Sequence, residues 1–356
     1  MRLRSLSLEN LRNIASARIE PGPGINVLHG DNGAGKTTVL EALVLLAKGR
    51  SFRSGALSSL IGPEQPLFRI VSELTSDDGS EHRLGAERDR EGWRVRLDGS
   101  TLGHVTAAAH LLPLVIMEPN SHALVSGAPD YRRRFLDWTV FHVKPDFLTE
   151  WRRYGRALKQ RNAALRSGNR SLVASLDPQV AALGEALHQQ RLDVFERLKP
   201  SVIENLAELS PRLGEPGLDL RPGWSDGSLA DALESGLERD LEMGQTRSGP
   251  HRGDIAFRVR GKAVRDRLSR GEQKILASAC LLAQGSLFAA DGHVPLMLLD
   301  DLASEFDAAH LEQVVHRAHA LQSQQFITGT EASPYEALGL PDASMFHVKQ
   351  GEILTG

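Results

Sequence analysis

Residues 30–37 match the phosphate-binding pattern G-x-x-x-x-G-K-[ST] at every fixed position. The glycines can take positive φ angles and let the backbone approach an anion, and N–H groups at the start of the following helix then point at a phosphate. Lys36 would bridge the β- and γ-phosphates of a nucleotide, and the Thr37 hydroxyl would ligate Mg²⁺. The pattern therefore predicts a site for ATP or GTP with Mg²⁺. Its members are Gly30, Asp31, Asn32, Gly33, Ala34, Gly35, Lys36 and Thr37, with Thr38 directly behind.

A second magnesium ligand is expected where the apolar run at 295–299 ends in Asp300 and Asp301. An acidic residue at the end of a buried strand is the usual partner of a phosphate loop. We expect Asp300 to hold Mg²⁺, directly or through water, and Asp301 to orient or deprotonate the attacking water. A strand followed by a capped turn is the alternative. Because Lys36 and Asp300 are far apart in sequence, much of the chain must be inserted between two halves of one site.

A third motif, Leu268 to Lys274, precedes that strand and leads into a helical pattern. Ser269 and Glu272 have the spacing of a capping box, which would simply start the helix. With the phosphate loop and the aspartate pair in this order, the motif also resembles the signature of ABC-type ATPases. That resemblance implies that Ser269, Arg270, Gly271 and Glu272 touch the nucleotide held by a second copy, so that the site closes only in a homodimer. Both interpretations stay open.

Several elements must position these motifs. A β-branched run at 25–29 and helical spacing up to Gly49 place the phosphate loop in a strand-to-helix turn. Apolar alternation between 68 and 99 predicts antiparallel hairpins. From about Asp130 helical spacing takes over, with a join at Gly168-Asn169 and a second helical stretch from about 178 to 209.

Pro200 is expected to kink or break that second stretch, because proline lacks the N–H that a helix needs. His251 lies in a tight turn before an alternating strand, so we expect a structural or DNA-near role for it rather than that of a catalytic base. Cys280, the only cysteine, lies in an apolar stretch and is expected to be a buried small hydrophobe.

Separated stretches along nearly the whole chain resemble the RecF family of SMC-type ATPase heads. The matching stretches are Leu6 to Asn13, the phosphate loop, Leu40 to Ala42, Ser51 to Arg53, Tyr131 to Asp137, Lys159 to Asn162, Ser248 to Arg252, and Leu299 to Asp307. The resemblance implies an α/β fold: an ABC-type P-loop ATPase head with an antiparallel β lobe and an inserted helical arm. The expected parts are residues 1–118 and 244–356 for the head and 119–243 for the arm.

The resemblance also implies a function in recombinational repair and replication restart. Members of the family dimerise on ATP, bind double-stranded DNA at gaps and single-strand/double-strand junctions, and hydrolyse ATP slowly. They act with RecO and RecR to help load RecA. These expectations come from the family and not from composition.

Several positions depart from the wider ABC pattern. Asp301 stands where transport ATPases commonly have a longer glutamate, and Thr328 and Thr330 offer hydroxyls where those enzymes have a switch histidine. A hydroxyl can hydrogen-bond a γ-phosphate but accepts protons poorly at neutral pH, so slow turnover is expected. No glutamine lies at 115–119 to supply the usual Q-loop contact. Gly253 occupies a position where an acidic residue is expected, unless Asp254 supplies it.

The arm carries an excess of basic residues, which would neutralise DNA phosphates without reading bases. A solvated helix face with local ion pairs is the alternative for any one residue. Aromatic residues make up 5% of the chain, which favours tracking of the duplex backbone over base stacking. The candidate DNA contacts are Arg132, Arg133, Arg134, Arg152, Arg153, Arg156, Lys159 and Arg161.

The net charge of −3 argues against attraction of nucleic acid by the whole surface. No apolar stretch is long enough to span a bilayer, so we expect no membrane contact and a cytoplasmic location. Two other functions are compatible with the sequence. One is a soluble ABC ATPase that energises a transport complex, and the other is a nucleotide-gated clamp in which hydrolysis is incidental.

Overall fold

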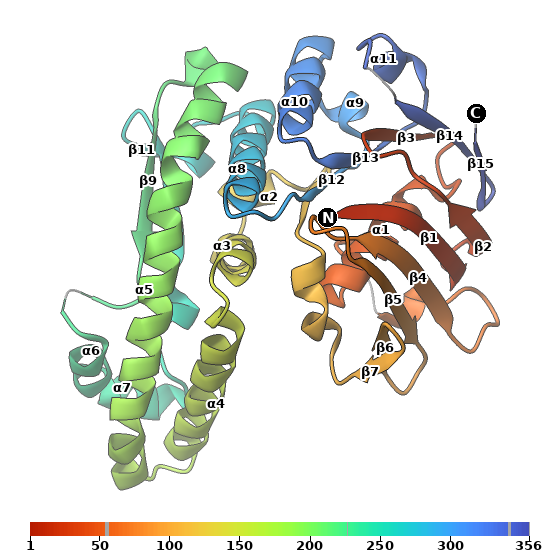
Figure 1. The fold of residues 1–356 in the computed structure, drawn as a ribbon. Helices are drawn as coiled ribbons and strands as arrows, with labels where there is room; N and C mark the ends of the chain where they lie inside the picture. Colours follow the sequence, from red (N-terminus) through yellow and green to blue (C-terminus); the bar gives the residue numbers. More distant parts are fainter. Residues whose placement is uncertain (54–56, 226, 341–342, 356) are drawn as a thin grey trace. The chain divides into compact units, whose positions relative to one another are not determined.

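The computed structural model describes residues 1–53, 57–225, 227–340 and 343–355. It divides into two compact units: the head unit, residues 1–121 and 284–356, and the arm unit, residues 122–283. Figure 1 shows the elements of each.

A six-stranded sheet of the head unit carries the phosphate loop. Its strands lie in the order β15-β14-β3-β13-β12-β8. Strands β3, β8, β12, β13 and β14 pair in parallel, whereas β15 pairs antiparallel with β14. Their bounds are β3 Ile25–His29, β8 Leu114–Met117, β12 Leu296–Leu299, β13 Gln324–Gly329, β14 Ser344–Lys349 and β15 Glu352–Thr355. The central strands β12 and β13 are buried at every position, as expected for a parallel sheet covered on both faces.

A second, antiparallel sheet has the order β2-β1-β4-β5-β6-β7. Buried and more exposed residues alternate along β4, which leaves one face of the sheet for the core. The hairpins expected between residues 68 and 99 are confirmed. The strands are β1 Arg2–Leu11, β2 Ile14–Ile19, β4 Phe68–Thr75, β5 Glu81–Arg88, β6 Trp93–Leu97 and β7 Ser100–Leu102.

Helix α1, Lys36–Lys48, contacts β13 of the parallel sheet and β1 and β5 of the antiparallel sheet. Nearly all its residues are buried, as expected for a helix that is apolar on every side. Gly49 ends it in the left-handed conformation, φ 64°, which confirms the expected C-cap.

The two sheets are also joined by the Gln324 side chain, which accepts from the Leu3 N–H at 2.8 Å and donates to the Leu3 carbonyl at 3.0 Å. The remaining helices of the head are α9 Leu302–Glu305, α10 Ala308–Ala320 and α11 Ser333–Glu336, with short 3-10 turns at Leu57–Leu60, Val105–Ala107 and Ala109–Leu111.

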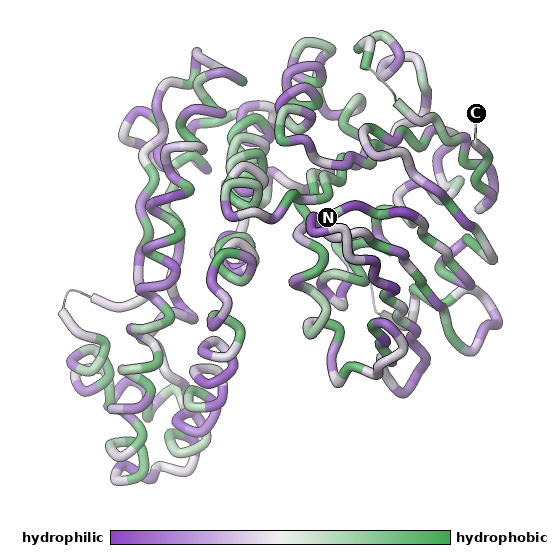
Figure 2. The backbone as a smooth tube through the Cα atoms, in the orientation of Figure 1, coloured by the Kyte–Doolittle hydropathy of each residue, from purple (hydrophilic) through white to green (hydrophobic). Residues whose placement is uncertain are grey.

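The arm unit is built around two long helices, α4 (Phe147–Arg166) and α5 (Arg170–Leu209). The expected join is confirmed: Gly168 takes φ 67°, and the Asn169 side chain caps α5 by accepting from the Leu172 N–H at 3.0 Å. The predicted break at Pro200 is wrong, because α5 continues through it. Hydrophilic and hydrophobic residues alternate in bands along both helices (Figure 2).

A three-stranded sheet, order β11-β10-β9, completes the arm with β9 Pro216–Arg221, β10 Asp254–Val259 and β11 Lys262–Ala263. Its other elements are α2 Ala123–Ser126, α3 Pro129–Val143, α6 Leu229–Ser235, α7 Leu237–Met243, the start of α8 Arg270–Ala290, and 3-10 turns at Pro211–Leu213, Pro250–Arg252 and Val264–Asp266. The second boundary differs from the expected 243/244: β10 pairs with β9, which keeps residues 244–283 with the arm.

Cys280 is buried among apolar residues of α8, as expected. Across the residues that the structure describes, none of the helices combines the length and apolar character that crossing a bilayer requires.

Candidate nucleotide-binding site

The candidate site lies at one edge of the parallel sheet. The strands β3, β13, β12 and β8 are neighbours, and their carboxyl ends meet at the same edge, where ligands of open α/β sheets bind. The phosphate loop follows β3, Thr328 lies near the end of β13, Asp300 follows β12 and Glu118 follows β8. Parallel pairing thus gathers residues that are far apart in the sequence.

The phosphate loop adopts a conformation that depends on its glycines. Gly30, Gly33 and Gly35 have φ angles of 145°, 80° and 119°. At Gly30 an added Cβ would also lie 2.1 Å from the carbonyl oxygen of Val348, so no other residue fits there. The loop therefore presents its backbone N–H groups at the start of α1, where an anion is favoured.

The C-terminal hairpin formed by β14 and β15 braces this loop. The N–H of Gly351, in the hairpin turn, donates to the carbonyl of Ala34 at 2.8 Å. From the other end of the chain, the Asn13 amide donates to the carbonyl of Gly33 at 2.8 Å. Two segments outside the motif thus fix the backbone that would meet a phosphate.

The Lys36 side chain is folded back over the loop. Its ammonium donates to the carbonyls of Gly30 at 2.6 Å and Asp31 at 2.8 Å. Burial lowers the pKa of Lys36, and the negative charges of Asp301, Asp300 and Asp31 oppose this shift. The ammonium is therefore held at the loop with uncompensated positive charge, ready for a phosphate.

Thr37 and Asp300 meet directly. Both the Thr37 and the Thr328 hydroxyls donate to Asp300 Oδ1, at 2.9 Å and 2.7 Å. Burial raises the pKa of Asp300 although both hydroxyls stabilise its charge. A buried carboxylate beside a hydroxyl is a set of hard oxygen ligands that fits Mg²⁺.

Asp301 takes the left-handed conformation, φ 53°, at the start of α9. The Ser304 hydroxyl donates to the Asp301 carboxylate at 2.8 Å, and the Asp301 N–H donates to Thr328 Oγ1 at 2.9 Å. Thr328 is buried and bonded to Asp300, whereas Thr330 is exposed just beyond the strand. The two expected switch hydroxyls therefore lie in different environments.

Glu118 is a site residue that the sequence motifs did not identify. It follows β8, next to Asp300, whose N–H donates to the Met117 carbonyl at 2.8 Å. Burial and the charge of Asp300 raise the pKa of Glu118 to about 7, and Lys48 acts in the opposite direction. An acidic residue directly after a buried apolar run, the same signal that identified Asp300, was present in the sequence.

Glu41 explains why two of the family-like stretches lie beside the loop. This carboxylate of α1 is 0% exposed and accepts from the Arg12 guanidinium at 2.7 Å and from the Ser51 hydroxyl. Arg53 lies 3.8 Å from the Glu41 carboxylate. The positive charge of Arg53 opposes the rise in the pKa of Asp300 that burial causes. A buried charge needs such partners, so the three segments are linked.

The signature-like residues belong to the arm unit. The Ser269 hydroxyl and N–H both donate to the Glu272 carboxylate, at 2.8 Å and 2.7 Å, and the Glu272 N–H donates to Ser269 Oγ at 3.3 Å. The capping box is thus confirmed. Arg270 and Gly271 are exposed in the first turn of α8. Their contact with a nucleotide stays a proposal.

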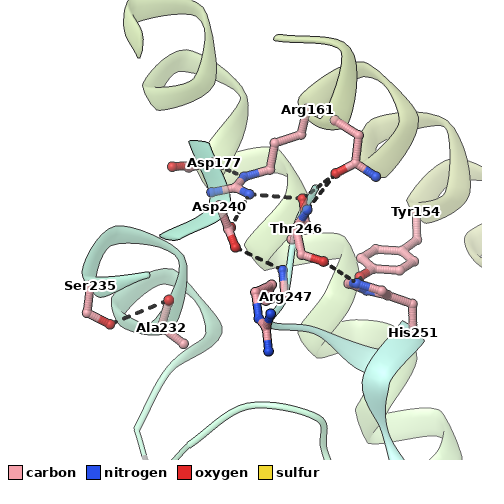
Figure 3. Close-up of polar contacts among 10 residues, drawn as sticks. Tyr154, Arg161, Asp177, Ala232, Ser235, Asp240, Thr246, Arg247 and His251 are labelled. Atoms are coloured by element: carbon pink, nitrogen blue, oxygen red, sulfur yellow. Dashed lines mark hydrogen bonds and ion pairs between the residues drawn. The ribbon is translucent and has the colours of Figure 1, made fainter. Parts of the chain in front are cut away.

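Arg161 was expected to face DNA, and this expectation is wrong. It is 0% exposed, and its guanidinium donates to Asp177 and Asp240 at 2.6 Å each and to Thr246 at 2.9 Å (Figure 3). A buried guanidinium requires carboxylate partners. They come from α5 and α7, so the network ties α4 to its neighbours.

His251 joins the same region through a structural role, as expected. Its two ring nitrogens bond the Tyr154 hydroxyl at 2.7 Å and the Thr246 carbonyl at 3.0 Å (Figure 3). Burial lowers the pKa of His251.

Arg132 is likewise unavailable to DNA. It is 8% exposed and forms a bidentate pair with Asp254, at 2.6 Å and 3.1 Å. The Asp254 carboxylate is thus engaged with Arg132, and its taking the acidic role expected at Gly253 stays a prediction. Arg133 is partly buried, and Arg134 is exposed but paired with Asp130.

The other candidate DNA contacts lie on α4. The four basic residues of the α4 stripe are all exposed, and the only acidic residue within α4, Glu150, accepts from Gln190 at 2.7 Å. They are Arg152, Arg153, Arg156 and Lys159.

Known proteins of one family resemble this chain along nearly its whole length. The model of the RecF/RecN/SMC N-terminal domain matches residues 2–350. DNA replication and repair protein RecF of Stenotrophomonas maltophilia (strain R551-3) is 43% identical over 362 residues, covering 99% of each chain. RecF of Marinomonas sp. (strain MWYL1) is 38% identical over 359 residues, covering 99% of this chain and 97% of the relative.

Solved structures show the same fold. One described as the recombination mediator protein RecF with ATP in the RecFOR pathway superposes with a TM-score of 0.89 at 24% identity, covering 99% of this chain and 97% of the other. An Smc head bound to the C-terminal winged-helix domain of ScpA gives 0.61 at 15% identity, covering 100% and 98%.

Fold and site together define a P-loop ATPase head of the RecF/RecN/SMC type. Identities near 40% along the full length narrow the class further. The chain belongs to the RecF family.

Proposed function

We propose that this protein binds ATP with Mg²⁺ in the head unit, forms a homodimer on ATP, and binds DNA in replication and recombinational repair. The observation that carries the proposal is the meeting of Thr37 and Thr328 on Asp300, beside a phosphate loop whose lysine is held over it. The relatives are DNA replication and repair proteins, and a solved structure of the same fold holds ATP.

Thr37 and Asp300 would hold the magnesium ion, because their oxygens already adjoin. The ion would offset phosphate charge when bound. Lys36 would exchange its two carbonyl acceptors for phosphate oxygens, and the loop N–H groups would bind the remaining phosphate charge.

Hydrolysis is proposed to be slow. Asp301 must orient the attacking water, yet its carboxylate already accepts a hydrogen bond from the Ser304 hydroxyl. The Thr328 hydroxyl donates its hydrogen bond to Asp300 and so has no proton left to donate to a phosphate. Hydrolysis then serves to release DNA. The same two bonds favour the second candidate, a nucleotide-gated clamp in which hydrolysis is incidental.

The α4 stripe supports binding to the duplex backbone. Exposed basic side chains neutralise phosphates and give salt-sensitive binding, and the four cations of the stripe outnumber Glu150, the one acidic residue of α4. Following the family, we propose that the protein acts in the cytoplasm at gaps and single-strand/double-strand junctions with RecO and RecR, helping RecA to load.

The first test is Lys36→Ala. Binding of a fluorescent ATP analogue with Mg²⁺ should weaken at least about tenfold, which corresponds to about 1.4 kcal/mol. ATP-dependent retention of duplex DNA should be lost with it. Lys349→Ala, which removes an exposed lysine of β14 in the same unit, is the matched control and should leave both unchanged.

Retention of duplex by Lys36→Ala at saturating ATP, equal to that of the parent chain, would contradict the proposal. Loss in both variants would point to general charge and not to the phosphate loop.

A further inference from the structure

A small hollow of the arm unit has four arginines in its lining. It lies among α3, α5, β9 and β10 and has an empty volume of about 240 Å³, part of it open to solvent. The hollow is small, with room for one small group at most. Its polar lining consists of Arg132, Arg133, His188, Arg191, Arg221 and Asp254.

Two of the arginines are already neutralised and fixed. Arg132 is bonded to Asp254, and Arg191 forms a bidentate pair with Asp137 at 2.7 Å and 3.0 Å. Arg191 also donates to the Pro250 carbonyl at 2.6 Å. Both guanidinium groups are therefore held rigidly in the wall, with their side chains 9% and 6% exposed.

The other two arginines leave positive charge uncompensated. Arg133 donates to the Gly253 carbonyl at 2.9 Å, and among the described residues its ion pair is a long 3.8 Å contact with Asp130. Arg221 is exposed at the end of β9, and no hydrogen bond or ion pair joins its side chain to any residue that the structure describes. Burial lowers the pKa of Arg133, the charge of Asp130 opposes this shift, the charge of Arg191 adds to it, and Asp254 and Asp137 oppose it more weakly.

His188 does not offset this charge. Burial and the neighbouring Arg191 lower the pKa of its imidazole, so it is neutral near pH 7. Its ring meets the Trp224 ring edge-on at 5.1 Å between centroids, which fixes the orientation of the imidazole. The four arginines of the lining carry one full charge more than their three aspartate partners, Asp254, Asp137 and the more distant Asp130.

We propose that this hollow binds a single phosphate group, held by Arg133 and Arg221 against a wall stiffened by Arg132 and Arg191. Guanidinium groups bind phosphate oxygens through paired N–H bonds, and a preformed wall lowers the ordering cost. The phosphate is either one of the DNA backbone, in which case the site rests on the proposed DNA-binding function, or a free phosphate ion.

The test uses Arg221→Gln in the full chain, with Arg239→Gln as matched control. Arg239 is an exposed arginine of α7, outside the hollow, and no ion pair is recorded for it among the described residues. Arg133→Gln is a second variant, since it removes the other unneutralised cation. Circular dichroism and thermal unfolding confirm that each variant is folded.

In the DNA arm, affinity for a blunt duplex with ATP is measured at several salt concentrations. Arg221→Gln should weaken binding at every sequence and reduce the slope of log affinity against log salt by about 1, the share of one phosphate. Arg239→Gln should leave the slope of the parent chain. This result supports a site for a backbone phosphate.

In the phosphate arm, the unfolding midpoint is measured with inorganic phosphate against chloride at equal ionic strength. The phosphate loop responds alike in both variants, so only the difference between them counts. A smaller rise for Arg221→Gln, with DNA binding unchanged, supports a site for free phosphate.

Equal behaviour of Arg221→Gln and Arg239→Gln in both arms overturns the proposal. Should the parent chain not bind duplex at all, the proposed function fails, and the phosphate arm still decides whether the hollow is a site.

Discussion

Glu118 shows how a single buried carboxyl couples the site to pH. Burial beside Asp300 raises its pKa from 4.5 to about 7. Between these values the unfolded chain has released a proton that the folded chain still holds. The free energy of unfolding therefore falls as pH rises through this window.

Glu118→Gln removes this titration. We expect the stability of the variant relative to the parent chain to increase by roughly 1–3 kcal/mol between about pH 4.5 and pH 7.5. Urea unfolding of both proteins at each pH, in the presence of a chelator, measures this difference in the free energy of unfolding.

Glu352→Gln, an exposed glutamate of β15, is the control and should show no such trend. A relative stability of Glu118→Gln that does not change with pH would show that Glu118 ionises as freely as an exposed carboxyl.

The functional residues fall into two groups by how they could be predicted. Lys36 and Thr37 belong to a local motif, so the sequence identified them. Glu118 became a neighbour of Asp300 only through the pairing of β8 with β12, which no local pattern reveals. Arg161 and Arg132 were misassigned for the same reason, because their carboxylate partners come from distant segments.

At the scale of elements, Ser269 could serve either as a helix cap or as a nucleotide contact of a partner copy. The structure shows the cap, and the arm unit offers a second capping box, Ser228 with Asp231, at the start of α6. Ser228 has no part in the signature-like motif. Comparing the two separates a structural role from an assembly role.

We expect Ser269→Ala and Ser228→Ala each to lower the free energy of unfolding by about 1 kcal/mol, the usual value of a lost cap. Only Ser269→Ala should also reduce ATP-dependent dimerisation, measured by analytical ultracentrifugation. Dimerisation impaired equally in both variants, or in neither, would leave Ser269 with its cap alone.

The long helix α5 shows a limit of reading elements from sequence. Pro178 and Pro200 each remove a backbone donor, which favours a break. Yet Val194, Phe195 and Val202 on either side are buried in the arm, and this packing outweighs the missing bonds. Strands and turns of the head were predictable because their periodicity and turn residues agree with the fold.

At the scale of the whole molecule, the proposed function requires two copies. The parent chain should sediment as a monomer alone and as a dimer with ATP, Mg²⁺ and duplex. Asp301→Asn keeps the loop and Asp300 but loses the charge that would orient water, so its dimer should persist after ATP addition while that of the parent decays.

A parent chain that stays monomeric with all three ligands in excess would contradict the proposed assembly. A parent dimer as long-lived as that of Asp301→Asn would favour the clamp in which hydrolysis is incidental.

The brace of the phosphate loop by Gly351 and Val348 has a consequence for biosynthesis. The ribosome makes residues 30–37 early, but the strands beside them and the hairpin that fixes them emerge some three hundred residues later. A growing polypeptide can therefore display the motif long before it can hold a nucleotide. Emergence of this hairpin, and not the appearance of the motif, sets the moment at which the protein can first respond to ATP.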